Sequence, residues 1–292
     1  MQPQLLESIA PRPFLKWVGG KSKLIPQYSQ YFPQKFANYY EPFLGGGAIF
    51  FHLLPQRAVL SDINPELVNV YCCVRDRVDE LIQKLQDHRD RHCQEYYYFM
   101  RACACTTAVD RAARMIYLNK TCFNGLYREN SKGQFNVPMG RYKNPAIVDP
   151  ELLYAAAIAL QKAELVVAPF ATVLEYANSD QDFVYFDPPY HPISSTSNFT
   201  AYNRHSFKPQ DQIRLRDTVV ELARRGVQVM ISNSDCPFIR DLYQDFYLHP
   251  ILAARSINSN GNRRGKITEL VITSYQTTRA ASTARRQRHL QT

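Results

Sequence analysis

The segment Asp187-Pro188-Pro189-Tyr190 has the residue types best suited to chemistry, and it directly follows the apolar run 183–186. Proline can neither donate a hydrogen bond to a sheet nor extend it, so this pattern predicts a buried strand that ends at a pocket. Ligands of open α/β sheets bind at such strand ends. The rigid proline carbonyls, the Asp187 carboxylate and the flat Tyr190 ring are together suited to holding a planar amine. A simple strand-ending turn is the alternative.

A second group of candidate residues lies in segment 38–53, where an aromatic strand leads through the glycines 45–47 into a helix. In α/β folds such a turn brings backbone N–H groups close to a ligand. The dinucleotide-binding fingerprint fails here, because position 50 is Phe where that motif needs Gly. A second strand, 57–60, is followed by Asp62, which is placed to accept hydrogen bonds from the ribose of an adenosine ligand. Capping a helix is the alternative role of Asp62.

The segment 14–22 places the single Trp of the chain beside glycines and lysines. Its Gly20-Lys21-Ser22 sequence matches the end of a P-loop, but that motif also requires a glycine at position 15, which is Leu. The nucleotide-triphosphatase interpretation therefore loses its main support. Trp17 is suited to stacking on a purine and Lys21 to binding a carboxylate or phosphate. An ordinary place in the core is the alternative for Trp17.

The composition is that of a globular, basic protein. The 292 residues, 45% of them apolar, are enough for one sizeable core and a subsidiary domain. A formal net charge of +9 favours a polyanionic partner, because basic surfaces bind phosphate by releasing counterions. The first 13 residues lack the pattern of a signal peptide, and no stretch reaches the roughly 18 apolar residues of a membrane span. We therefore expect a soluble, cytoplasmic protein without a membrane partner.

The seven cysteines are odd in number and include no Cys-x-x-Cys pair. This pattern favours reduced thiols in a reducing compartment. Cys93, Cys103 and Cys105, together with His92, do not have the spacing of a standard zinc finger. We therefore expect buried or idle thiols and no metal site.

Apolar periodicity predicts a helical insertion followed by an α/β pattern. Asn64 and Pro65 are good helix-starting residues, and spacings of three and four then predict one amphipathic helix as far as Leu85. Further helices are expected at 93–101, 107–119, 149–162 and 209–225. Strands are expected at 164–168 and 227–231, with an antiparallel pair at 246–257 and 267–275. The polar segment 191–208 has the composition of a mobile lid.

Residues 120–144 form a long basic segment without apolar periodicity, which is typical of a binding segment. Turn signals at Asn124-Gly125 and at 131–133 predict a hairpin. Arginine on a rigid hairpin suits readout of the DNA major groove, where its fork pairs with guanine. A solvated basic loop is the alternative. The hairpin would carry these basic and aromatic side chains: Arg128, Lys132, Arg141, Tyr142 and Lys143.

The order of the motifs resembles that of the Dam-type DNA adenine-N6 methyltransferases of the D12 class. The motifs are Lys16-Trp17-x-Gly-Gly-Lys21, Pro42-Phe43-x-Gly-x-Gly47, Asp62-Ile-Asn64, Asp187-Pro-Pro-Tyr190 and Arg255-Ser256-Ile257. Their order is more specific than any one of them, and the resemblance covers roughly residues 12–276. Within the hairpin, the residues that resemble the family's recognition hairpin are 124–126, 128, 133–138 and 140–142. Phe123 stands where the family often has Tyr.

The resemblance implies an α/β, Rossmann-like fold: a seven-stranded, mostly parallel sheet with an antiparallel last hairpin and an inserted helical target-recognition domain. The catalytic domain that binds S-adenosylmethionine would be discontinuous, comprising residues 1–62 and 163–277. Residues 63–162 would form the DNA target-recognition domain, with the hairpin near 120–144. Residues 278–292 carry four Arg and no acid, and we expect a disordered basic tail.

The implied activity is site-specific methylation of adenine N6 in duplex GATC, with S-adenosylmethionine as cofactor. We expect a monomer in solution, located in the nucleoid or in a phage-infected cell. The target adenine would flip onto Tyr190, and its N6 would donate to Asp187 and to the Pro188 carbonyl. Because the sulfonium supplies the reactivity, no metal is needed. The implied catalytic residues are Asp187, Pro188, Pro189 and Tyr190. The implied cofactor-binding residues are Trp17, Lys21, Phe43, Gly45, Asp62 and Asp187, and the implied DNA-binding residues are Lys16, Asn124, Arg128, Pro138, Arg141 and Tyr142.

Three other functions stay open at this point. An RNA methyltransferase would use the same pocket, but it would not need an arginine-bearing hairpin, because A-form RNA hides its major groove. A P-loop ATPase or helicase would need the glycine that is missing at position 15. A DNA-binding protein without catalysis would be expected to lack Asp187 or Tyr190, and both are present.

Overall fold

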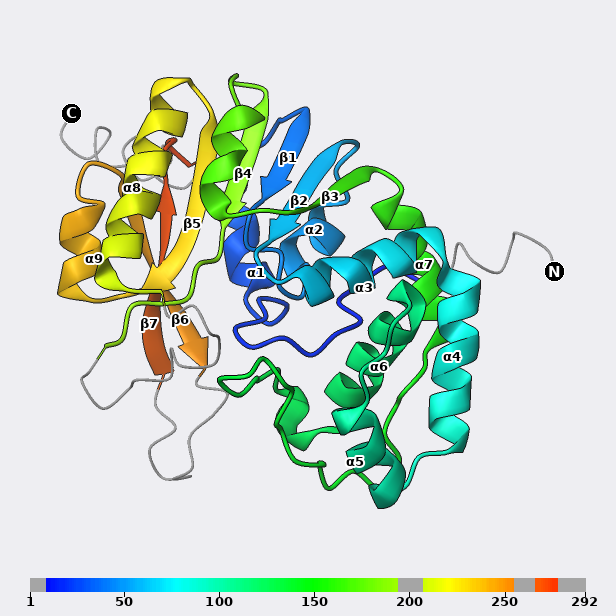
Figure 1. Cartoon of the computed structure of the whole chain (residues 1–292). Coiled ribbons are helices and arrows are strands. Elements are labelled where there is room, and N and C mark those ends of the chain that lie inside the picture. Colours follow the sequence, from blue (N-terminus) through cyan, green and yellow to red (C-terminus); the bar gives the residue numbers. More distant parts are fainter. Residues whose placement is uncertain (1–8, 194–206, 255–265, 278–292) are drawn as a thin grey trace, which may run out of the picture. The chain divides into compact units, whose positions relative to one another are not determined.

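The computed structural model describes residues 9–193, 207–254 and 266–277 (Figure 1). The contacts within the chain form two compact units. One, here called the helical unit, comprises residues 1–22 and 44–169, and the other, here called the sheet unit, comprises residues 23–43, 170–200 and 206–292. The predicted basic tail, most of the predicted lid and the Arg255-Ser256-Ile257 motif lie outside the described residues. The predicted boundaries of the catalytic and recognition domains stay a prediction.

Seven strands have the order β3-β2-β1-β4-β5-β7-β6. In the sheet unit, β1 (Asn38–Glu41) pairs in parallel with β4 (Asp182–Phe186), and β4 pairs in parallel with β5 (Gln228–Ser234). There, β7 (Lys266–Thr273) is antiparallel to both β5 and β6 (Tyr247–Ala254). In the helical unit, β2 (Ala58–Asp62) and β3 (Ala163–Val167) are parallel. The predicted mostly parallel sheet with an antiparallel last hairpin is confirmed.

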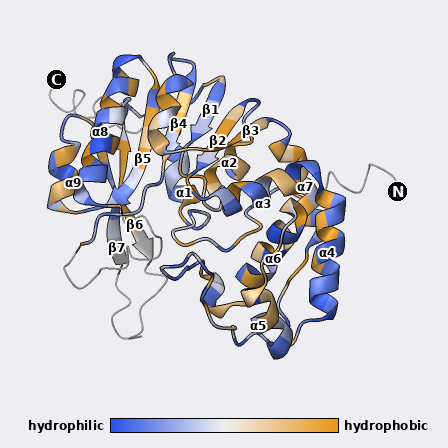
Figure 2. Ribbon diagram, in the orientation of Figure 1, coloured by the Kyte–Doolittle hydropathy of each residue, from blue (hydrophilic) through white to orange (hydrophobic). Residues whose placement is uncertain are grey.

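The core of the sheet unit is built around β4, whose five residues are all buried. Aromatic side chains from segment 32–39 pack against Phe183 on this strand. Helix α8 (Pro209–Arg224) contacts β5 through an apolar face, and its opposite face is polar (Figure 2). The remaining short helical segments of this unit are α1 (Ile25–Tyr28), η2 (Ser29–Tyr31), η4 (Phe170–Glu175) and α9 (Pro237–Leu242).

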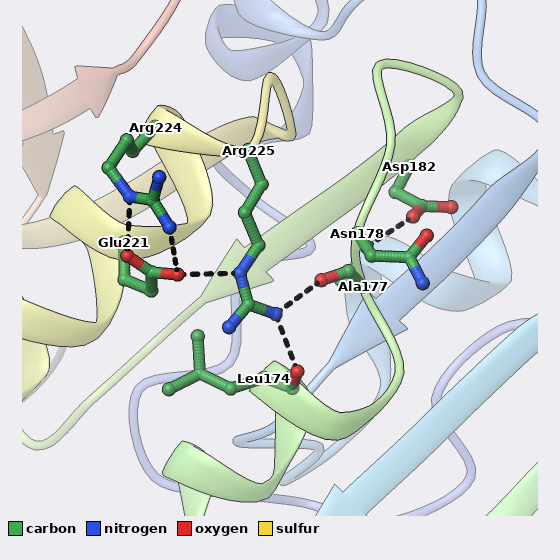
Figure 3. Close-up of polar contacts among 7 residues, drawn as sticks. All are labelled: Leu174, Ala177, Asn178, Asp182, Glu221, Arg224 and Arg225. Atoms are coloured by element: carbon green, nitrogen blue, oxygen red, sulfur yellow. Dashed lines mark hydrogen bonds and ion pairs between the residues drawn. The ribbon is translucent and has the colours of Figure 1, made fainter.

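Arg225 fixes the end of α8 to the segment that leads into β4 (Figure 3). Its Nη1 donates to the carbonyl of Leu174 at 2.6 Å and to that of Ala177 at 3.3 Å. Its Nε donates at 2.8 Å to Glu221, which also binds Arg224. One side chain thus supplies donors to a carbonyl near the end of η4 and to another just after that helix.

The helical unit contains α2 (Ala48–Leu53), α3 (Pro65–Asp76), α4 (Val78–Asp90), α5 (Gln94–Ala102), α6 (Ala108–Thr121), η3 (Phe123–Gly125) and α7 (Pro150–Leu160). Helices α3, α4 and α5 each contact α6, whose buried side chains form the centre of this unit. Asn64 caps α3 and Asp149 caps α7, as their sequence positions predict. No helix among the described residues has the length and apolar character that crossing a membrane requires.

The prediction of one continuous helix through Leu85 is wrong, because the helix breaks at Arg77. Arg77 has a φ of −141° and a ψ of 39°, outside the helical region. After the break, α4 starts as a new helix with Asp79 and Glu80 in its first turn. Negative charges at that position interact favourably with the helix dipole. An ion pair between Arg77 and Glu80 spans this start. The apolar spacing continues across the break, so periodicity alone does not reveal it.

Candidate functional site

The carboxylate of Asp187 lies directly after the last residue of β4 and is held by buried hydroxyl groups. The Ser232 hydroxyl donates to Asp187 Oδ1 at 2.8 Å, and the hydroxyl groups of Ser232 and Tyr185 lie 2.9 Å apart. Ser232 and Tyr185 are fully buried on neighbouring parallel strands, so their positions are fixed by the sheet. The orientation of Asp187 is therefore set by the core of the sheet unit.

The backbone around Pro189 is held by a network of buried amides. Pro188 is buried, and the carbonyl of exposed Pro189 accepts a hydrogen bond from Gln212 Nε2 at 2.9 Å. Gln212 Oε1 in turn accepts from Asn233 Nδ2 at 3.0 Å, and Asn233 Oδ1 accepts from the backbone N–H of His191 at 3.2 Å. Gln212 and Asn233 are 1% and 0% exposed. Buried amides without partners are costly, so this network fixes the backbone on both sides of Tyr190.

The Tyr190 ring is oriented by a hydrogen bond from its hydroxyl to Glu269 Oε2, at 2.9 Å. Burial and the nearby hydroxyl of Tyr28 raise the pKa of Tyr190, as do the negative charges of Asp187 and Glu269. The hydroxyl therefore stays protonated and donates. The sequence motif predicts a role for the Tyr190 ring alone and does not indicate Glu269, Gln212 or Ser232. Among these three residues, only Ser232 had a signal in the sequence, because it begins the polar run 232–234 at the end of a predicted strand.

Asp62 lies at the end of β2 and braces the glycine turn. Its Oδ2 accepts from the backbone N–H of Gly45 at 3.1 Å, and its Oδ1 accepts from that of Asn64 at 3.0 Å. Burial raises the pKa of Asp62, and the backbone donors partly oppose that shift. The helix cap is Asn64, which accepts from two N–H groups of α3, so Asp62 does not have that alternative role.

Trp17 and Lys21 lie in the same unit as Asp62. A Cβ on Gly45 would lie 2.8 Å from Trp17 Cδ1, so a glycine is needed where the turn passes the indole. The indole also stacks on Tyr127, with ring centroids 5.6 Å apart. Lys21 is 4% exposed, and its Nζ donates to the Gly19 carbonyl at 2.6 Å. The carboxylate, the indole and the ammonium group are therefore all fixed by contacts of their own.

Phe43 belongs to the sheet unit and lies two residues beyond β1. It stacks on Phe170 at a centroid distance of 5.6 Å and meets Phe186 and Phe207 edge to face. Phe43 is half-buried. An aromatic cluster of this kind offers flat apolar surface to a planar ring.

Segment 120–144 is a hairpin with little regular pairing. Two isolated antiparallel bridges, 122 with 139 and 129 with 135, join its arms, and Asn130 and Gln134 close its tip. The Asn124-Gly125 signal does not form the hairpin turn. Both residues have positive φ, 56° and 64°, within the short helix η3 at the base of the segment.

The predicted DNA-binding residues lie mainly on the exposed surface of this segment. Arg128 is half-exposed and bound across the hairpin, with its Nε donating to Asn136 Oδ1 at 2.7 Å. The exposed Lys16 reaches the hairpin base, and its Nζ lies 4.2 Å from the centre of the Tyr142 ring. Three other predicted contact residues are exposed: Asn124, Pro138 and Arg141. Phe123 is 49% exposed, and its backbone N–H donates to the Pro138 carbonyl.

Residues 17–257 match the family model of the D12 class N6 adenine-specific DNA methyltransferases. The chain belongs to this family. The methyltransferase is 46% identical over 272 residues to the Type II methyltransferase M1.LlaDCHI of Lactococcus lactis subsp. cremoris, covering 90% of this chain and 95% of the relative. It is 39% identical over 265 residues to the DNA adenine methylase of Escherichia coli (strain K12), covering 89% and 94%.

A third relative, the Type II methyltransferase M.MjaIII of Methanocaldococcus jannaschii, is 40% identical over 287 residues, covering 90% of this chain and 99% of the relative. Family membership confirms the predicted activity, methylation of adenine N6 in DNA, and the predicted methyl donor, S-adenosylmethionine. The roles assigned to single residues stay predictions.

Proposed function

We propose that this enzyme methylates the adenine of duplex GATC, and that Asp187 and Tyr190 carry the reaction. The observation that supports the catalytic assignment is the fixed geometry at the end of β4, where Ser232 holds the Asp187 carboxylate, Gln212 holds the Pro189 carbonyl and Glu269 holds the Tyr190 ring. Preorganised acceptors of this kind lower a barrier because they need no reorganisation during reaction. We place this activity on DNA in the cytoplasm.

The cofactor would be held by Trp17, Lys21, Gly45 and Asp62 of the helical unit, and the role of Phe43 stays a prediction from the sequence. These residues fit it, because Asp62 offers acceptors at a strand end, beside a turn that only glycine allows next to Trp17. When bound, S-adenosylmethionine supplies an electrophilic methyl group on a positive sulfonium.

The protein's part in the reaction is to hold the amine. In our proposal, N6 of a flipped adenine donates to the Asp187 carboxylate and to the Pro188 carbonyl, while the base stacks on Tyr190. Because Ser232 fixes Asp187 and Glu269 fixes the Tyr190 ring, both groups meet the base in one orientation. Because the amine is already held in this orientation, less entropy is lost in reaching the transition state than in a free encounter.

The GATC assignment is tested by transfer of labelled methyl groups to a set of duplexes. We expect incorporation into a duplex with one GATC site, and strongly reduced incorporation into duplexes with any one base pair of that site changed. A duplex RNA of the same sequence serves as the control for nucleic-acid class. Efficient methylation of another sequence, with GATC inactive, would refute the assignment while leaving the family's chemistry intact.

The hairpin's part in recognition is tested at Arg128. Arginine pairs bidentately with guanine, so Arg128→Ala should cost about 1–3 kcal/mol on the cognate site and narrow the rate ratio between GATC and altered sites. The matched control is Arg141→Ala, since we assign the exposed Arg141 to a phosphate, and loss of a phosphate contact weakens binding to all duplexes alike. If Arg128→Ala slows methylation of every duplex by the same factor, then Arg128 binds the backbone and another residue reads the base.

A further inference from the structure

Asn119, near the end of α6, connects two segments of the helical unit that lie far apart in the sequence. Its Oδ1 accepts from the backbone N–H of Lys16 at 2.8 Å, and its Nδ2 donates to the Lys16 carbonyl at 2.7 Å. The same Nδ2 donates to the Gly125 carbonyl at 3.0 Å. Asn119 is 3% exposed. One buried amide therefore fixes the backbone of Lys16 beside the base of the hairpin.

The side chain of Lys16 is constrained as well as its backbone. A Cβ on Gly125 would lie 2.4 Å from Lys16 Cδ and 2.6 Å from its Cβ, so the lysine stem occupies the space that the glycine leaves. Beyond it, Nζ lies over the ring of Tyr142. Lys16 is nonetheless exposed. It is thus a surface cation whose backbone, stem and head are each held by a different residue.

Most surface lysines are free to take many rotamers, and binding must restrict them. A side chain that is already held in one direction loses less freedom on binding, and it also meets a ligand in one register. On the exposed Lys16, Asn119 binds the backbone, Gly125 leaves room for the stem and Tyr142 contacts the ammonium group. The arrangement favours a role in recognition.

We propose that Asn119 is a positioning residue for sequence readout. By fixing Lys16 against the Asn124-Gly125 turn, it sets the direction in which the Lys16 ammonium group meets a base edge of the target duplex. The ligand is the major-groove edge of a base pair, whose acceptors a lysine can bind. This inference rests on the proposed function, in which the hairpin reads duplex DNA.

The test is a double-mutant cycle on Lys16 and Asn119, with kcat/KM measured on GATC and on its single-base-pair variants. Lys16→Ala should reduce discrimination at one base pair by about tenfold. Asn119→Ala should reduce discrimination at that same base pair by about three- to tenfold, and should have no further effect in the Lys16→Ala background. The affinity for S-adenosylmethionine, measured by calorimetry, should stay within about twofold of wild type.

The matched control is Thr121→Val, because Thr121 is buried on the same helix and its hydroxyl bonds only within that helix in the contacts described, to the Tyr117 carbonyl at 2.6 Å. It should leave discrimination unchanged. If Asn119→Ala does not fold, Asn119→Ser, which keeps one polar group, replaces it and should give a smaller loss at the same base pair.

The outcomes separate this inference from the proposed function. If the Asn119 variants leave discrimination unchanged, or lower it equally with and without Lys16, the positioning role is overturned. If Arg128→Ala still narrows discrimination in that case, the proposed readout by the hairpin survives. If neither Lys16→Ala nor Arg128→Ala changes discrimination at any base pair, the proposed readout fails together with the inference.

Discussion

Strand β4 begins with one aspartate and is followed directly by another, and the two carboxylates differ in burial and in partners. Asp182, its first residue, is 2% exposed and accepts four hydrogen bonds: from the backbone of Asn178 and Ser179, from Asn38 Nδ2 and from the Tyr40 hydroxyl. Asp187, just after the last residue, is half-exposed and accepts from the Ser232 hydroxyl. The Asp182–Asn178 contact appears in Figure 3, at the end of the strand opposite to Asp187.

The comparison shows how one residue type serves structure at one end of a strand and chemistry at the other. At Asp182, backbone and side-chain donors converge on the carboxylate, and burial together with the charge of Asp182 raises the pKa of Tyr40 to about 12. At Asp187, the backbone of the following loop is held by the side chains of Gln212 and Asn233. The fold should therefore need Asp182 and tolerate loss of Asp187.

Asp187→Ala should have the largest effect on activity. We expect the methylation rate to fall on the order of a thousandfold, because an acceptor aimed at the reacting amine is lost from a preorganised site. The melting temperature should change little, and duplex DNA should still bind, since phosphate contacts dominate affinity. Single-turnover rates and thermal unfolding measure the two effects. Appreciable turnover by the folded variant would overturn the mechanism.

Asp182→Ala should have the reverse effect. It should lower the free energy of unfolding by about 3 kcal/mol, because several donors lose a common buried acceptor. Urea denaturation measures this loss, with the exposed Asp180→Ala as the control from the same loop. The rate per folded molecule should stay close to wild type. A loss of rate as large as that of Asp187→Ala, with stability intact, would erase the contrast between the two ends of β4.

Asp62→Ala sharpens the comparison, because Asp62 combines features of both aspartates. Like Asp187 it lies at the carboxyl end of a strand, and like Asp182 it accepts hydrogen bonds from backbone N–H groups. Cofactor affinity should fall by about 1.5–3 kcal/mol, the usual worth of a hydrogen bond to a charged group. The control is Asn64→Ala, which removes a helix cap and should cost about 1 kcal/mol of stability without changing cofactor affinity. Calorimetry decides, and equal affinity for wild type and a folded Asp62→Ala protein would remove Asp62 from the site.

Ser232→Ala should have the smallest effect. The variant keeps the Asp187 carboxylate but loses the hydroxyl that orients it, so kcat should fall about three- to tenfold, in line with one hydrogen bond. The KM for duplex DNA should not change, because Ser232 is buried and makes no contact with solvent. Steady-state kinetics provide both values. An unchanged kcat would show that the sheet positions Asp187 without Ser232.

The sequence determined the features that depend on neighbouring residues. The strand before Asp187, the caps Asn64 and Asp149, and the glycine turn each follow from local backbone preferences. The order of the motifs also indicated the family, which the comparisons confirm. Local patterns failed at Arg77, where apolar periodicity runs through a break in the helix, and at Asn124-Gly125, where the turn forms at the base of the hairpin instead of its tip.

The tertiary structure alone decided what holds each functional side chain. Ser232 is 45 residues from Asp187, Glu269 is 79 residues from Tyr190, and Asn119 is 103 residues from Lys16. The backbone donors of Asp182 come from the preceding loop, but its other partners, Asn38 and Tyr40, and the Ser232 partner of Asp187 lie on other strands. A residue's type and its neighbours in the sequence indicate its backbone preferences. A hydrogen bond between distant residues forms only when strand register and helix packing bring its two atoms within about 3 Å of each other.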